Sequence, residues 1–88
     1  MAKSVFTKKY DQFRRSLIQA RKAAGMTQLG LAAKLSRPQS FVSKFERGER
    51  RLDVIEFLDI AQALGFDPAI FLKNISKIKV ASSSKSLL

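Results

Sequence analysis

Residues 39–47 combine two kinds of side chain that a helix would place on opposite faces. The apolar residues Phe41, Val42 and Phe45 recur at helical spacing and would point inward. The remaining side chains would point outward, and they are Gln39, Ser40, Ser43, Lys44 and Arg47. Amide, hydroxyl, ammonium and guanidinium groups hydrogen-bond to base edges or phosphates, and a helix of this length can enter the major groove of DNA. The pattern therefore indicates a nucleic-acid-binding helix, with a solvated polar helix face as the alternative.

The chain offers little for catalysis or metal binding. It contains no cysteine and no histidine, so thiolate chemistry, disulfides and the commonest general base and metal ligand are missing. There is no glycine-rich phosphate loop and no nucleophile beside a base. The carboxylates that follow the polar helix lack the spacing of a metal cage or an acid–base pair, and they are Glu46, Glu49, Asp53, Glu56 and Asp59. We therefore expect a protein that is not an enzyme and that binds no cofactor or metal.

The positive charge is concentrated in the N-terminal part of the chain. Residues 1–51 hold 13 Lys and Arg against 3 Asp and Glu, a net charge of +10, whereas residues 52–88 hold four of each. A basic surface of this kind either keeps a protein soluble or faces phosphates and releases counterions on binding. Its coincidence with the polar helix favours the phosphate-facing role. Charge alone does not separate DNA from RNA or from anionic lipid.

Capping and breaking residues divide the chain into five predicted helices, over about 8–24, 28–35, 39–47, 54–64 and 68–76. Thr7, Thr27, Asp53 and Asp67 suit N-caps, and Asp53 with Glu56 forms a capping-box pattern. Pro38 suits the first turn of the third helix. No window alternates as a core strand would. The predicted fold is all-α: a compact five-helix domain over residues 1–78, followed by a flexible Ser-rich tail over 79–88.

Eighty-eight residues provide one modest hydrophobic core, so self-association would help stability. No apolar run approaches the length of a membrane span, and we expect a cytoplasmic, nucleoid-associated protein. The predicted core residues are Leu17, Met26, Leu31, Ala32, Leu35, Val42, Phe45, Ile55, Leu58, Ala61 and Leu64. The C-terminal part carries further apolar residues, which we expect to form a dimer interface, with capping of the core as the alternative. They are Phe66, Ile70, Phe71, Ile75 and Ile78.

Over residues 13–72 the chain resembles the helix-turn-helix family of phage repressors and Cro proteins, also called the XRE family. The matching residues are Arg21, Gly25, Thr27, Gln28, Leu31, Ala32, Val42, Ser43, Glu46, Gly48, Leu58, Ala63 and Leu64. Two positions depart from the family pattern. Ser36 stands where the turn usually has glycine, which predicts a mildly strained left-handed residue, and Gly30 lies inside a helix. The resemblance implies a helix-turn-helix formed by the second and third helices.

The resemblance also implies roles for individual residues. The third helix would contact bases through Gln39, Ser40, Ser43 and Lys44. The resemblance places the Gln28 side chain against a phosphate, and the alternative is an exposed polar residue at a helix terminus. Arg21 and Glu46 would form an ion pair that ties the first helix to the third, unless both side chains extend into water. The arginines around the motif suit phosphates better than bases, and they are Arg37, Arg47, Arg50 and Arg51.

The predicted function is therefore a transcriptional regulator that binds double-stranded DNA sequence-specifically, as a homodimer on a palindromic operator. Two other roles use the same domain: an antitoxin-type regulator that also holds a toxin protein, and a restriction–modification controller. A further alternative is an adaptor that binds protein or RNA instead of DNA. A membrane-binding role is disfavoured because the motif explains the positive charge better.

Overall fold

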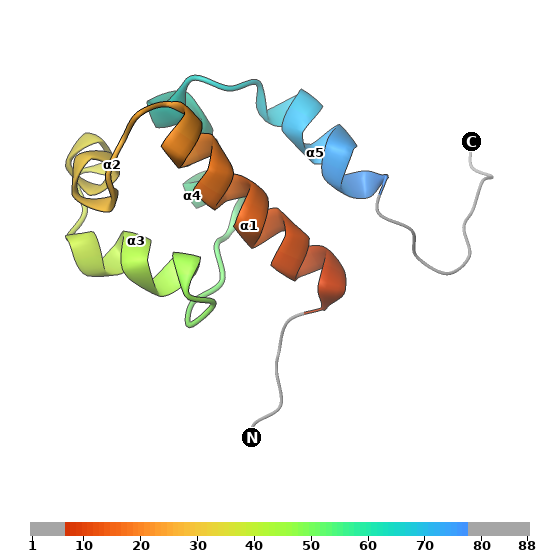
Figure 1. The fold of residues 1–88 in the computed structure, drawn as a ribbon, viewed down its shortest axis with the longest axis horizontal. Coiled ribbons are helices and arrows are strands. Elements are labelled where there is room, and N and C mark those ends of the chain that lie inside the picture. Colours follow the sequence, from red (N-terminus) through yellow and green to blue (C-terminus); the bar gives the residue numbers. More distant parts are fainter. Residues whose placement is uncertain (1–6, 78–88) are drawn as a thin grey trace.

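The computed structural model describes residues 7–77, and in this part of the chain the fold is all-α (Figure 1). The helices are α1 (Lys8–Ala23), α2 (Gln28–Leu35), α3 (Gln39–Glu46), α4 (Val54–Leu64) and α5 (Pro68–Ser76). Each observed bound lies within one residue of the predicted one. The tail predicted over residues 79–88 lies outside the described residues. None of the described helices combines the length and the apolar character needed to cross a membrane.

Side-chain caps explain where α1, α2, α4 and α5 begin. The Thr27 hydroxyl accepts a hydrogen bond from the Gly30 amide at 2.9 Å, and so starts α2. At the start of α4, the Asp53 carboxylate accepts from the Glu56 amide at 2.7 Å. The Glu56 carboxylate in turn accepts from the Asp53 amide at 3.0 Å, which completes the predicted capping box. These local bonds fix the helix boundaries because they satisfy amides that have no partner within the helix.

The turn between α2 and α3 contains the only described residue other than glycine with a positive φ. Ser36 adopts the predicted left-handed conformation, with φ 57° and ψ 41°. The Arg37 amide then bonds back to the Ala32 carbonyl at 3.0 Å, which closes the end of α2. The prediction for Pro38 was off by one position. Pro38 is the N-cap of α3, and the first turn of the helix begins at Gln39. Its extended backbone turns the chain, and its carbonyl accepts from Phe41 at 2.9 Å.

The core lies between α1, α2, α3 and α4, and most of the predicted core residues pack there. Two predictions on α4 were wrong: Ile55 is 64% exposed and Leu58 is 42% exposed. The buried face of α4 instead runs through Phe57, Ile60 and Ala61, at spacings of three and one. This helix is apolar at most positions, so its hydrophobic pattern did not determine which side faces the core. Phe41 also joins the core, with 7% exposure.

An aromatic cluster joins α5 to the rest of the domain. Phe66 and Phe71 stack with ring centroids 4.7 Å apart, and Phe71 also contacts Phe13 and Phe57. Ile75 is buried as well. Three residues expected at a dimer interface therefore pack within the monomer, because α5 needs them to attach to the core. Of the other two, Ile70 is exposed and Ile78 lies outside the described residues.

Candidate nucleic-acid interface

The outer face of α3 carries the polar residues that the sequence predicted for base contacts. Gln39, Ser40 and Lys44 are exposed, and Ser43 is half-buried with its hydroxyl donating to the Ser40 carbonyl at 3.3 Å. The opposite face is buried through Phe41, Val42, Phe45 and Glu46. Helix α3 lies at the edge of the bundle in Figure 1 and runs away from α2. The fold therefore holds α3 by one face and leaves the other face open to a ligand.

A buried ion pair fixes one flank of α3 to α1. The Arg21 guanidinium donates to both oxygens of Glu46, with Nε–Oε2 at 2.7 Å and Nη2–Oε1 at 3.0 Å. The side chains are only 11% and 5% exposed. Arg21 also donates to the Met26 carbonyl at 2.8 Å, and Arg14 donates to the backbone carbonyl of Glu46. This is the pair that the family resemblance implies, and it excludes the solvated alternative for both charges.

Gln28 is held by the same carboxylate. Its amide nitrogen donates to Glu46 Oε1 at 2.8 Å, so the side chain at the start of α2 is turned toward α3. Gln28 is half-buried, so it is not simply an exposed polar residue at a helix terminus. A phosphate contact by Gln28 stays a prediction.

Two of the predicted phosphate-binding arginines have separate partners near the end of α3. Arg47 forms a bidentate ion pair with Glu49, with Nε–Oε2 at 2.9 Å and Nη2–Oε1 at 3.0 Å. Both side chains are more than half exposed. The hydrogen bonds from Arg47 lower the pKa of Glu49 and raise that of Arg47 itself. Arg51 instead lies over the ring of Tyr10 on α1, 4.3 Å from the ring centroid.

The other two arginines meet at one carboxylate. Arg50 donates to both oxygens of Glu56 at 2.9 and 2.7 Å, and Arg37 donates to Glu56 Oε2 at 3.2 Å. Both guanidiniums also lie near the Phe41 ring, at 4.0 Å for Arg37 and 4.9 Å for Arg50. The pKa of Glu56 is lowered to about 2, chiefly because Arg50 donates to its carboxylate. Sequence reasoning assigned Glu56 only a capping role, since nothing in the spacing of the arginines shows that they converge there.

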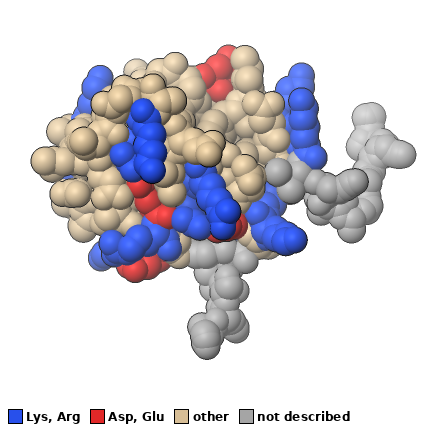
Figure 2. All heavy atoms as spheres, viewed as in Figure 1, with Lys and Arg blue, Asp and Glu red and all other residues tan. Residues whose placement is uncertain are grey.

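The basic side chains form a mixed surface. Figure 2 shows Lys and Arg gathered over the lower part of one face, where α1, α3 and the segment after α3 lie, with Asp and Glu between them. Two carboxylates pair with arginines at and after the end of α3: Glu49 with Arg47, and Glu56 with Arg50. The surface is therefore basic, and carboxylates within it hold some of its arginines in place.

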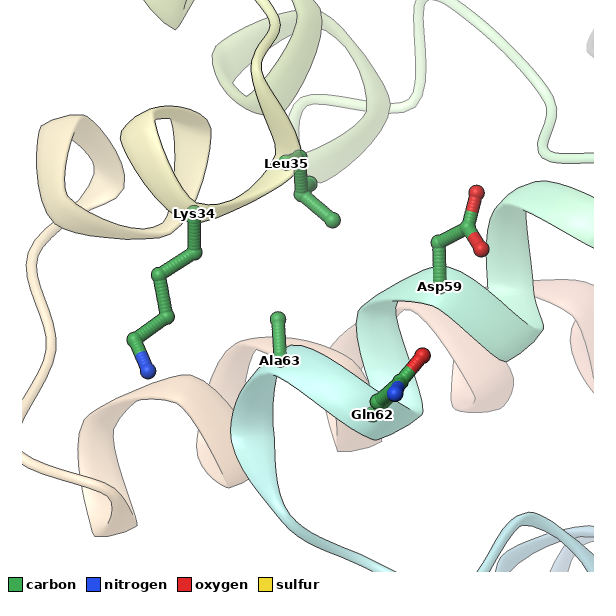
Figure 3. Close-up of a pocket in the computed structure, with 5 residues that line it drawn as sticks. All are labelled: Lys34, Leu35, Asp59, Gln62 and Ala63. Carbon is green, nitrogen blue, oxygen red and sulfur yellow. The ribbon is translucent and has the colours of Figure 1, made fainter.

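A cleft of about 380 Å³ lies between α2 and α4, away from the outer face of α3 (Figure 3). Leu35 and Ala63 project toward each other across it, whereas Lys34 and Asp59 stand at separate places on its rim. Among residues 7–77, no group of three acidic side chains is placed to hold a metal ion.

The comparisons with known proteins agree with this geometry. A family model described as helix-turn-helix matches residues 17–71. An XRE-family-like protein from Pseudomonas syringae pv. tomato is 50% identical, with a TM-score of 0.78 over 82% of this chain and 88% of that one. No curated protein matches the chain.

Two further structures are similar in fold. The wild-type restriction–modification controller protein C.Esp1396I is 24% identical, with a TM-score of 0.73 over 82% of this chain and 95% of that one. The clp gene regulator ClgR from C. glutamicum is 21% identical, with a TM-score of 0.70 over 85% and 96%. Together, the family match, the half-identical relative and the helix-turn-helix formed by α2 and α3 lead to one conclusion: the chain belongs to the XRE family of helix-turn-helix DNA-binding regulators.

Proposed function

We propose that this protein is a transcriptional regulator that binds double-stranded DNA sequence-specifically in the cytoplasm, with α3 in the major groove. The observation that carries the proposal is the division of α3 into a buried apolar face and an open polar one. Gln39 offers an amide that matches adenine N6 and N7, and Lys44 offers a donor for guanine O6 or N7. Ser40 and Ser43 offer hydroxyls for bases or phosphates.

Phosphate contacts would come from Gln28 and from the four arginines around α3. Arginines that pair with a carboxylate can still contact DNA, because a guanidinium has five N–H donors. A related fold supports duplex DNA as the ligand: the controller protein C.Esp1396I has been crystallised as a tetramer with its natural 35-base-pair operator.

We further propose that the protein acts as a dimer on a palindromic operator. One copy reads few base pairs, and two copies would place their α3 helices about 34–36 Å apart, in successive major grooves. The contact between copies has to avoid the basic surface, because like charges repel. Helix α4 contains no Lys or Arg, and its Val54, Ile55 and Leu58 side chains are exposed. This apolar face suits a second copy better than the C-terminal residues that pack in the core.

Selection of bound sequences from a random duplex pool at physiological salt tests the DNA-binding proposal. We expect enrichment of a two-fold symmetric sequence whose half-sites are about one helical turn apart. A pool that shows no enrichment would contradict sequence-specific binding and favour the adaptor role. Enrichment of a single half-site would contradict only the dimer.

The substitution Ile55→Glu tests the dimer contact, because it puts two carboxylates against an apolar surface in each complex. Sedimentation should show a shift toward monomer, and the palindrome should be bound more weakly than by wild type. Ile70→Glu, an exposed apolar residue on α5, is the matched control and should leave the dimer intact. If Ile70→Glu weakens the dimer and Ile55→Glu does not, the interface lies on α5.

A further inference from the structure

We propose that Glu56 is a positioning residue, which holds Arg37 and Arg50 as a preformed phosphate clamp on one flank of α3. The inference rests on the proposed DNA-binding function and extends it. It assigns a role in DNA binding to an acidic residue, although a negative charge near DNA is ordinarily unfavourable.

The clamp joins three segments of the chain. Arg37 lies in the turn before α3, Arg50 lies in the segment after α3, and Glu56 lies in the first turn of α4. Both oxygens of Glu56 accept from Arg50, and Oε2 also accepts from Arg37. The Asp53 amide donates to Oε1 at 3.0 Å, which fixes the carboxylate itself. Glu56 is therefore a rigid acceptor whose position is set by the helix cap.

Phe41 provides the second support for the arginines. Its ring lies under the guanidinium of Arg37 at 4.0 Å and near that of Arg50 at 4.9 Å. Phe41 is buried, so the ring cannot move without disturbing the core. Each guanidinium is thus held by a carboxylate and an aromatic ring, which restricts side chains that otherwise sample many rotamers.

The arginines remain open to a ligand on their outer side. Each side chain is 38% exposed, whereas Glu56 is only 15% exposed. Arg37 gives a single N–H to Glu56, which leaves most of its five donors available. The negative charge is therefore the inner partner and the positive charges form the outer surface.

The position of the clamp relative to α3 matches the geometry of a groove. Phe41 lies in the first turn of α3 on its buried face, three residues before Lys44 on the open face, and the two guanidiniums lie over its ring. When a helix enters a major groove, its outer face meets base edges and its flanks meet the phosphates that border the groove. Two arginines over Phe41 would therefore meet phosphates without losing much side-chain entropy on binding.

The sign of the effect of Glu56→Gln separates positioning from simple electrostatics. The substitution removes one negative charge from a DNA-binding surface, and simple electrostatics predicts tighter binding. The clamp predicts weaker binding, by about tenfold, because two arginines lose their fixed positions. The loss should be equal on a selected operator and on a mixed-sequence duplex at low salt. The log–log salt dependence should also flatten by up to about one unit.

Asp59→Asn is the matched control. Asp59 lies on the same helix, three residues after Glu56, and makes no hydrogen bond or ion pair within residues 7–77. Its substitution changes the net charge by the same amount, and we expect binding as tight as wild type or slightly tighter. Thermal melts of both variants ensure that binding is compared between folded proteins.

A double-mutant cycle excludes an indirect effect of Glu56 through stability. In an Arg37→Ala, Arg50→Ala background, Glu56→Gln should no longer weaken binding, since nothing is left for it to position. If Glu56→Gln fails to fold, Arg50→Lys replaces it as the test, because lysine keeps the charge and loses the two-fold contact. Arg15→Lys on α1 is then the control, and only Arg50→Lys should weaken binding.

Two results would overturn the clamp. Wild-type protein that binds duplex DNA, together with a folded Glu56→Gln variant that binds as tightly or more tightly, would contradict the clamp alone. Wild-type protein that binds no duplex would contradict the proposed function and the clamp together.

Discussion

Two carboxylates near α3 each accept two hydrogen bonds from one arginine: Glu46 at the end of α3 and Glu56 at the start of α4. We call these two places the Glu46 flank and the Glu56 flank of α3. Glu46 is 5% exposed and its partner Arg21 is 11% exposed, so this pair lies inside the domain between α1 and α3. Glu56 is also mostly covered, but its partners Arg37 and Arg50 are 38% exposed. The chemistry is the same on the two flanks, and the exposure of the arginines differs.

This difference assigns different roles to the two carboxylates. When an arginine is buried, its donors are used within the protein, and the pair can act only on the position of α3. When an arginine stays half-exposed, the carboxylate orients it and leaves donors for a ligand. The comparison predicts that the Glu46 flank controls stability, whereas the Glu56 flank controls DNA affinity more than stability.

The largest effect on stability should come from Arg21→Ala. It leaves Glu46 buried with only the Gln28 amide as a side-chain partner, and we expect a loss of about 3–5 kcal/mol in the free energy of unfolding. Thermal denaturation measures this, with Arg15→Ala in an exposed pair with Asp11 as the control. A melting temperature within a degree or two of wild type would show that the buried pair does not tie α1 to α3.

The hydrogen bonds of Glu56 should make a smaller contribution to the free energy of unfolding, and this contribution should depend on pH. The folded pKa of Glu56 is about 2 and its ordinary value is 4.5, so the unfolded state binds the proton more readily. The contribution, about 1.5–3 kcal/mol for bonds to a charged group, is complete above about pH 4.5 and is lost as pH falls toward 2. The measurement is the free energy of unfolding of wild type minus that of Glu56→Gln across this range. A difference that does not change with pH would mean that Arg50 does not stabilise the ionised carboxylate.

The smallest effect should come from Gln28→Ala. Glu46 keeps both hydrogen bonds from Arg21 and loses one neutral donor, so we expect a loss of about 1 kcal/mol in unfolding free energy. Urea denaturation can resolve this value. A loss as large as that of Arg21→Ala would mean that the carboxylate depends on Gln28 as much as on arginine.

Local patterns predicted most of the fold. The starts of α1, α2, α4 and α5 follow from caps that lie within four residues of the amides they satisfy, and the two faces of α3 follow from its spacing. The phase of α4 was not predictable from spacing, because Val54, Ile55, Phe57, Leu58 and Ile60 leave apolar residues all around that helix. The core role of Phe66, Phe71 and Ile75 required knowledge of how α5 docks.

The candidate site was predictable where it lies on one helix. Gln39, Ser40 and Lys44 share the open face of α3, as their spacing indicates. The convergence of Arg37 and Arg50 on Glu56 depends on the path of the chain between α3 and α4, which has no periodic signal. The Arg21–Glu46 pair spans 25 residues and came from family resemblance, not from spacing.

Whether α3 reads bases can be measured directly. Wild type and Lys44→Ala would each be titrated against a set of single-base variants of the selected operator. We expect Lys44→Ala to lose about 1–3 kcal/mol of specific binding at one base-pair position in each half-site, with non-specific binding less affected. An equal loss on every operator variant would make Lys44 a phosphate contact and contradict base reading by this face of α3.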